Sequence, residues 1–141
     1  MTLDNKDIYI LLNHLKSSVG DDRSETKRIA QIFGVLDIVD SLYRKVNGKP
    51  YLLMLGDFNS NRKSPPLNDL EKAGFFIINY NYNVNDVYTT IYKSKKEDID
   101  YVIFNKQLYD NSKIKQFKVF HDKSFNKISD HYPIFLDLEI K

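Results

Sequence analysis

Four short polar segments carry the side chains that could perform acid–base or metal chemistry in this sequence. Carboxylate oxygens suit a hard divalent cation such as Mg²⁺ or Mn²⁺, and imidazoles and carboxylates are common general acids and bases. Hydrolysis of a phosphate ester needs such a set, because it requires a charge-offsetting metal, a base for water and an acid for the leaving oxygen. The candidate side chains are those of His14, Asp57, Asn59, Asp100, Asp130 and His131.

The segment Gly56–Asn59 is the most informative of the four. It follows Tyr51–Leu55, a uniformly apolar run that predicts a strand covered on both faces. The two-residue repeat of a strand puts Asp57 and Asn59 on one face, at the carboxyl edge where layered sheets hold ligands. The same residue types also favour an Asx turn that leaves the strand. Both interpretations stay open.

The second acid, Asp100, lies in an expected strand over Ile99–Phe104 and shares its face with Val102. A carboxylate so near the core must accept hydrogen bonds, pair with a cation or bind a metal. The alternative is a strand start that is still in solvent. This alternative fits Asp98 better than Asp100.

The two histidines follow different patterns. His131 stands beside Asp130 in the turn Ser129–Pro133, and because adjacent side chains point apart, the two would serve different partners. Alone, this segment is typical of a surface turn. His14 follows the apolar strand expected over Ile8–Leu12, and a lone histidine is more often structural than catalytic.

Strands and helices alternate along the chain, which predicts a layered α/β fold in one domain. A long helix should begin after Asp22, an N-cap with Glu25 three residues on, and end before Asn47. The biased segment Asn79–Asp86 predicts a loop without functional weight. A shorter helix is expected over 65–73, and the strands are Ile8–Leu12, Tyr51–Leu55, Phe75–Ile78, Ile99–Phe104, Ile114–Phe120 and Tyr132–Ile140.

The composition of the 141 residues excludes several classes of protein. The absence of cysteine excludes disulfide scaffolds, thiol nucleophiles and Cys-ligated metal sites. The net charge of +2, with acids and bases interspersed, favours a mixed solvated surface over the basic stripe of a duplex binder. We expect no membrane span, and the polar start predicts no export signal, which leaves the localisation open.

The four polar segments, taken in order, resemble the endonuclease/exonuclease/phosphatase superfamily. The resemblance implies a layered α/β-sandwich of the deoxyribonuclease-like type and magnesium- or manganese-dependent phosphodiester hydrolysis. It implies nucleic acid as the substrate, with phosphoinositide or sphingomyelin hydrolysis as the runner-up. The segments that carry it are Asn13–Ser17, Gly56–Asn59, Ile99–Tyr101 and Ser129–Pro133.

The resemblance also implies roles in proton transfer. His131 would be the base, directly or through a metal-bound water, and Asp100 would orient it by hydrogen bonding. His14 resembles the residue that stabilises the phosphate or protonates the leaving group.

The remaining roles implied by the resemblance concern the metal and the phosphate. Asp130 would be a metal ligand, and Asp57 would position the attacking water or help to hold the metal. Asn59 would hydrogen-bond the phosphate. Arg28 lies near a place where several members of the superfamily carry an arginine.

One feature of the superfamily has no match here, because the first half of its domains supplies an early asparagine and a metal-binding glutamate. We therefore expect residues 1–141 to form the C-terminal portion of such a domain, without the N-terminal portion. The alternative is a catalytically incomplete remnant. Strands that are apolar on both faces would then lack one covering layer, which predicts a homodimer, a complementing N-terminal half or poor solubility. The glutamates without matching context are Glu25, Glu71, Glu97 and Glu139.

Overall fold

The computed structural model describes residues 2–3, 6–17 and 23–141 of the chain. No helix in these ranges is long and apolar enough to cross a membrane. The helices are α1 (Ser24–Lys45), α2 (Pro65–Lys72), α3 (Val84–Val87) and α4 (Lys106–Asp110), with 3-10 turns η1 (Ile78–Asn81) and η2 (Phe125–Lys127). The strands are β1 (Thr2–Leu3), β2 (Lys6–His14), β3 (Tyr51–Asp57), β4 (Phe76–Ile77), β5 (Thr90–Tyr92), β6 (Lys95–Glu97), β7 (Asp100–Phe104), β8 (Ser112–Val119) and β9 (Ile134–Ile140).

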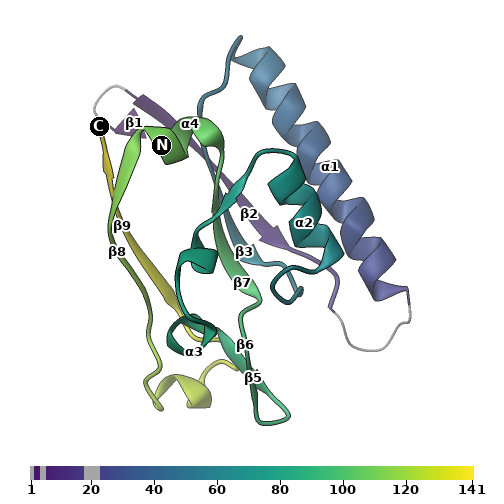
Figure 1. The fold of residues 1–141 in the computed structure, drawn as a ribbon, viewed down its shortest axis with the longest axis vertical. Coiled ribbons are helices and arrows are strands. Elements are labelled where there is room, and N and C mark those ends of the chain that lie inside the picture. Colours follow the sequence, from purple (N-terminus) through teal and green to yellow (C-terminus); the bar gives the residue numbers. More distant parts are fainter. Residues whose placement is uncertain (1, 4–5, 18–22) are drawn as a thin grey trace.

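The molecule is built in three layers around one sheet of strand order β1-β2-β3-β7-β4. Helices α1 and α2 lie on one face of this sheet, and the two-stranded sheet β8–β9 lies on the other (Figure 1). Strand β2 runs parallel to β3, whereas β7 runs antiparallel to it. The hairpin β5–β6 forms a further two-stranded sheet. The predicted layered α/β fold class is confirmed.

Strand β3 is apolar throughout because both of its faces are covered. Leu52 and Met54 are fully buried on the side of the helices. Leu53 packs on the opposite side, against the cluster that contains the inward side chains of β8 and β9. The alternation along one strand thus fills two separate cores.

The second half of strand β2 is covered on only one of its two faces. Tyr9 and Leu11 pack against the helix-side core. On the other face Ile8 is buried, but Ile10 and Leu12 are 43% and 80% exposed. The sheet β8–β9 therefore covers β3 and β7 and leaves the end of β2 bare. The expectation that Tyr51–Leu55 would also lack a covering layer is wrong, because side chains of this strand are buried in a core on each face.

Two sequence expectations about local structure need correction. Helix α1 begins at Ser24, with Arg23 at its N-cap and no side-chain cap hydrogen bond; Asp22 lies outside the described residues. The segment predicted as a loop over Asn79–Asp86 contains most of η1 and the start of α3. Helix α3 forms because the Asn83 side chain caps it, accepting a hydrogen bond from the backbone N–H of Asn85.

Gly56 permits an unusually close approach between β2 and β3. It has φ +127°, and a Cβ atom at this position would lie 2.0 Å from the carbonyl oxygen of Asn13. Only glycine adopts this backbone conformation without strain. Gly56, immediately before Asp57, is therefore required for the backbone conformation with which β3 ends.

We expect Gly56→Ala to lower the free energy of unfolding by more than about 2 kcal/mol, because it adds both a steric clash and backbone strain. The matched control is Gly34→Ala in α1, where no described atom outside the local helix backbone lies within 4 Å of the new Cβ. That control should gain about 0.5–1 kcal/mol from reduced backbone entropy. Urea unfolding of the two variants measures the difference, and equal stabilities would contradict this account of Gly56.

Candidate active site

The sheet register brings three of the candidate side chains into one row. His14 of β2 pairs with Asp57 of β3, and Asp57 pairs with Asp100 of β7. Residues that pair directly across neighbouring strands point to the same face of the sheet. The row therefore lies on the face that β8–β9 covers, beside the apolar side chains of the same three strands. His131 joins the row from the segment that precedes β9.

The distances define a compact group around the Asp57 carboxylate. His131 Nδ1 lies 2.7 Å from Asp100 Oδ2, and His131 Nε2 lies 4.0 Å from Asp57 Oδ2. His14 Nε2 lies 3.7 Å from the same Asp57 oxygen, although its side chain is 79% exposed. The Asp57 side chain is only 17% exposed and lies between the two imidazoles.

Asn59 forms the Asx turn that the residue types of Gly56–Asn59 also favour, and β3 ends before it at Asp57. Its backbone N–H donates to Asp57 Oδ1 at 2.7 Å, which forms the Asx turn. Its side-chain Nδ2 donates to Asp57 Oδ2 at 3.0 Å and to the carbonyl oxygen of Leu15 at 3.0 Å. Asn59 adopts φ +47°, which asparagine tolerates better than most residues. The turn is therefore also the device that orients the Asp57 carboxylate.

The charges of the row alter the proton affinities of its members. The hydrogen bond to Asp100 is the main cause that raises the pKa of His131 to about 9, against an opposing effect of burial. Burial raises the pKa of Asp57, and the nearby charge of Asp100 adds to it, whereas the backbone N–H of Asn59 acts in the opposite direction. Since Nδ1 of His131 is bonded to Asp100, Nε2 is the ring atom that can exchange a proton with a ligand.

A buried polar cluster fixes the start of β7 and was not found from the sequence. Asn79, fully buried, donates from Nδ2 to Asp98 Oδ1 at 2.9 Å and to the Asp100 carbonyl at 3.0 Å. Its Oδ1 accepts from the backbone N–H of Val102 at 3.0 Å. The biased composition of the surrounding segment hid this asparagine, which holds the Asp98 side chain and the backbone of Asp100 and Val102.

Asp98 corrects the expectation of a solvent-exposed strand start. It is only 2% exposed, and its carboxylate accepts hydrogen bonds from Asn79 and, at 2.8 Å, from Arg62 Nε. Burial is the largest effect on Asp98 and raises its pKa to about 6, although the charge of Arg62 opposes the change. The guanidinium makes burial of this acid tolerable.

The remaining predicted residues, Asp130 and Arg28, differ in exposure. The Asp130 side chain is exposed, and its carbonyl oxygen accepts a hydrogen bond from Thr90. In the described part of the chain, the cluster with metal-ligand spacing consists of Asp57, Asp100 and His131, so ligation by Asp130 stays a prediction. Arg28 is buried in α1 and donates to the carbonyl of Lys16.

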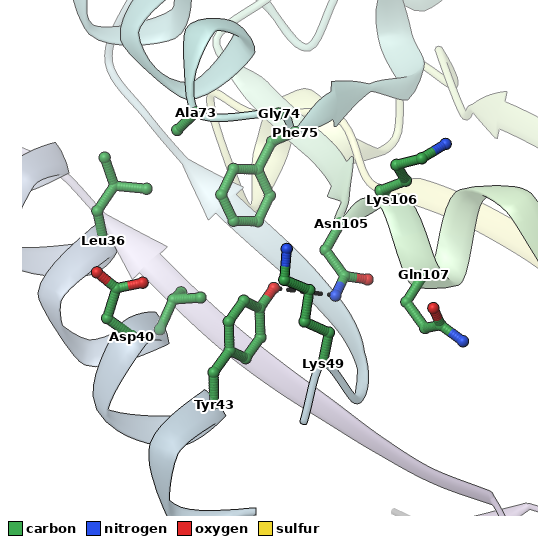
Figure 2. A pocket seen from close by; sticks show the side chains of 11 residues that line it. Leu36, Asp40, Tyr43, Lys49, Ala73, Gly74, Phe75, Asn105, Lys106 and Gln107 are labelled. Carbon is green, nitrogen blue, oxygen red and sulfur yellow. Dashed lines mark hydrogen bonds between the residues drawn. The ribbon is translucent and has the colours of Figure 1, made fainter. Parts of the chain in front are cut away.

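One of the cavities of the described structure is far from these side chains, and another lies beside them. A cavity of about 370 Å³ lies between α1 and α4, at the opposite end of β3 and β7 (Figure 2). Asn105 reaches Tyr43 there, but its amide also bonds the backbone of Leu52, Pro50 and Leu108, so it serves the fold. The second cavity, about 480 Å³, lies beside Asp100 between β3, β7 and the start of β9.

Comparison with known proteins finds similarity in structure but not in sequence. No protein-family model and no curated protein matches the chain. The human Nocturnin catalytic domain aligns with 98% of this chain at TM-score 0.73 and 21% identity. An endonuclease/exonuclease/phosphatase family protein from Leptotrichia buccalis aligns with 99% at TM-score 0.66 and 18% identity.

A third solved structure, the Bacteroides thetaiotaomicron mannosyl-6-phosphatase, aligns with 94% of this chain at TM-score 0.64 and 18% identity. The alignments cover 49%, 52% and 51% of the three solved chains. The chain therefore spans about half the length of the structures it matches. Over that half, the protein has the fold of the endonuclease/exonuclease/phosphatase, or deoxyribonuclease-like, superfamily.

Proposed function

We propose that this chain carries catalytic groups of a divalent-metal-dependent phosphodiester hydrolase, and that its substrate is a nucleic acid. One observation carries the proposal: Asp57, Asp100 and His131 converge at one sheet end, with potential ligand atoms within 4.8 Å of one another. Two carboxylates beside an imidazole supply both negative charge for a cation and a proton acceptor.

The donor set fits a hard cation. The Asp57 carboxylate is half-buried beside the Asp100 carboxylate, and these surroundings disfavour its charged form. Positive charge at this position would stabilise the ionised form. Asp57 is the residue of the cluster that would hold the cation, and Asp130, next to His131 in the sequence, is proposed as a second ligand. When bound, Mg²⁺ or Mn²⁺ offsets the charge that develops on the phosphoryl oxygens.

His131 is the proposed base. Its Nδ1–H donates to Asp100, which fixes the ring orientation and leaves Nε2 to accept a proton from water. The Asp100 carboxylate then stabilises the imidazolium that results. Because the same carboxylate raises the pKa of His131 to about 9, the free chain holds this imidazole protonated at neutral pH. Catalysis as a base requires the neutral form.

Asn59 and His14 are the proposed contacts of the substrate phosphate. His14 is in the same row and its exposed imidazole can donate to a phosphoryl or leaving oxygen. Asn59 orients Asp57 in the free chain, so a hydrogen bond to phosphate requires its amide to exchange one of its present partners.

The hairpin β5–β6 supports a polyanionic substrate. Its tip presents the exposed side chains of Lys93, Lys95 and Lys96, and the hairpin projects from the body of the molecule (Figure 1). The hairpin starts at Thr90, which forms a β-bridge with His131. The lysines therefore extend from the same end of the fold as the site. Lysines that contact phosphates bind nucleic acid without reading its sequence.

The second candidate is hydrolysis of a smaller phosphate ester with the same residues. The similarity to a mannosyl-6-phosphatase favours this alternative, and a phosphoinositide or sphingomyelin substrate would use the same chemistry. A small ester leaves the lysine-bearing hairpin without a partner. Replacing the hairpin lysines by acidic residues should therefore slow hydrolysis of a nucleic acid but not of a small phosphate ester.

A further part of the proposal is that this site works in a larger assembly. The bare face of β2, formed by Ile10 and Leu12, borders His14 in the same strand. We propose that a second copy of the chain or a complementing N-terminal half covers it. A catalytically incomplete remnant is the alternative if neither restores turnover.

The first test is magnesium-dependent cleavage of labelled DNA by the purified chain. Asp57→Ala and His131→Ala should each lower the rate about 100-fold or more, because each removes a group used in the reaction. The matched control, Asp69→Ala, removes an acid of α2 that pairs with Lys72 and belongs to none of the proposed catalytic groups, and should leave the rate unchanged. Cleavage that survives Asp57→Ala would reject the proposal and indicate a contaminating nuclease.

The second test follows from the proton affinity of His131. The pKa of His131 is raised from 6.5 to about 9 in the folded chain, so its contribution to stability is complete below pH 6.5 and disappears as the pH rises through 9. Allowing for solvent screening, we expect a loss of about 1–2 kcal/mol across this range.

Urea unfolding in EDTA at several pH values between 6.5 and 9 measures this loss. The titration of Asp98 does not change the stability in this pH range, because it acts between the ordinary pKa of 3.8 and the raised pKa of about 6. His131→Ala and Asp100→Asn should both flatten the dependence. A slope unchanged in both variants would contradict the charged pairing of the two residues.

The third test concerns the bare face of β2. Self-association measured by sedimentation over a dilution series should weaken in Leu12→Lys, since the change charges the uncovered apolar face. Ile128→Lys is the matched control, because Ile128 is also 80% exposed but lies after η2, away from β2. A wild-type chain that stays monomeric and soluble at all concentrations would count against a second copy.

A further inference from the structure

Asp100 and His131 lie on separate parts of the backbone and must be held in register. Asp100 begins β7, which pairs with β3 and β4. His131 belongs to the segment that leads to β9, and β9 pairs with β8. A short side-chain hydrogen bond between two such segments forms reliably only when the backbones are fixed relative to each other.

Thr89 contacts both backbones. It is fully buried, and its hydroxyl oxygen accepts from the N–H groups of Ile99 and Asp100, each at 3.2 Å. Its carbonyl oxygen accepts from the N–H of Tyr132 at 2.7 Å, and its own N–H donates to the Glu97 carbonyl at 2.9 Å. One residue thus binds the start of β7 and the residue that follows His131.

Thr90 adds a second connection on the same side. Its hydroxyl donates to the carbonyl oxygen of Asp130 at 2.9 Å, and its backbone forms the β-bridge to His131. Together with the bond from His131 to Asp100, these contacts close a ring of hydrogen bonds. The ring runs from Asp100 through Thr89 to the His131 segment and back through the imidazole.

We infer that Thr89 is a positioning residue that holds Asp100 and His131 in their hydrogen-bonded arrangement. The catalytic use of that pair rests on the proposed function, whereas its geometry does not. The hydroxyl is the specific requirement, because it accepts hydrogen bonds from two partly buried N–H groups and a methyl group cannot. Thr89→Val keeps the shape of the side chain and leaves both N–H groups without this acceptor.

The test uses a signal that comes from the pair itself. The Nδ1 proton of His131, hydrogen-bonded to Asp100, should give a downfield proton NMR resonance at low temperature, and Asp100→Asn should remove it, which assigns the signal. We expect Thr89→Val to lose this resonance and Thr89→Ser, which retains the hydroxyl, to keep it. Where the wild-type chain cleaves DNA, Thr89→Val should lower kcat with little change in KM, and Thr89→Ser should restore it.

A matched control separates positioning from stability. Leu108→Ala empties a buried site in α4, at the opposite end of β7 from Asp100, and should lower the urea concentration at the midpoint of unfolding. The resonance should persist in this variant while it remains folded. A folded Thr89→Val chain that keeps the resonance would overturn the inference, and so would its loss in Leu108→Ala.

The outcomes for the inference and for the proposed function are distinguishable. A chain that cleaves nothing, alone or with a complementing half, but loses the resonance in Thr89→Val and keeps it in Thr89→Ser and Leu108→Ala, rejects the proposed function and supports the role of Thr89. A wild-type chain without the resonance overturns both, because the pair is then not formed in solution. Cleavage that depends on His131 but is unaffected by Thr89→Val retains the function and rejects the role of Thr89.

Discussion

The common register of β2, β3 and β7 is the constraint on which the site depends. Because side chains alternate along a strand, the pairing of Leu12, Leu55 and Val102 places an apolar row on one face, and the next row on that face is His14, Asp57 and Asp100. A slip of one residue would turn an acid or an imidazole toward the helices and an apolar side chain toward the site. Gly56 and Asn13 lie between these rows, and the missing Cβ of Gly56 lets the two strands approach there. The close contact therefore disfavours other registers as well as ending the strand.

Local pattern predicted much of this arrangement, and distant contacts explain what it missed. The apolar run of β3 and the polar residues after it are contiguous in sequence, so both the strand and its functional end could be predicted. Asp98 and Asp100 have the same position in the two-residue repeat, and the pattern alone cannot say which is the more buried. Arg62, 36 residues from Asp98, decides it by supplying the opposite charge. Thr89 and Asn79 were missed for the same reason, since their partners, mostly backbone groups, are distant in sequence and only the folded chain brings them close.

The electrostatics of the row link protonation to cation binding. Asp57 and Asp100 are like charges at neighbouring positions, and the imidazolium of His131 lies between them as the counter-charge. A divalent cation beside Asp57 would take over that task and favour release of the His131 proton, because both positive charges compete for the same carboxylates. The same carboxylates thus stabilise the protonated form of His131 in the free chain and, with a cation bound beside them, would favour its neutral form, which can act as a base.

The bare end of β2 makes completion of the core and completion of the site one problem. Leu12 and His14 are two residues apart on the same face, and both are largely exposed. Any layer that buries Leu12 must also pass beside His14 and reduce the water around Asp57. Since charge interactions strengthen as water is excluded, the same contact that stabilises the fold would strengthen the interactions of the row with a bound phosphate. The exposed apolar face and the exposed imidazole are therefore two parts of one surface, and a partner that satisfies only one of them would leave the other in solvent.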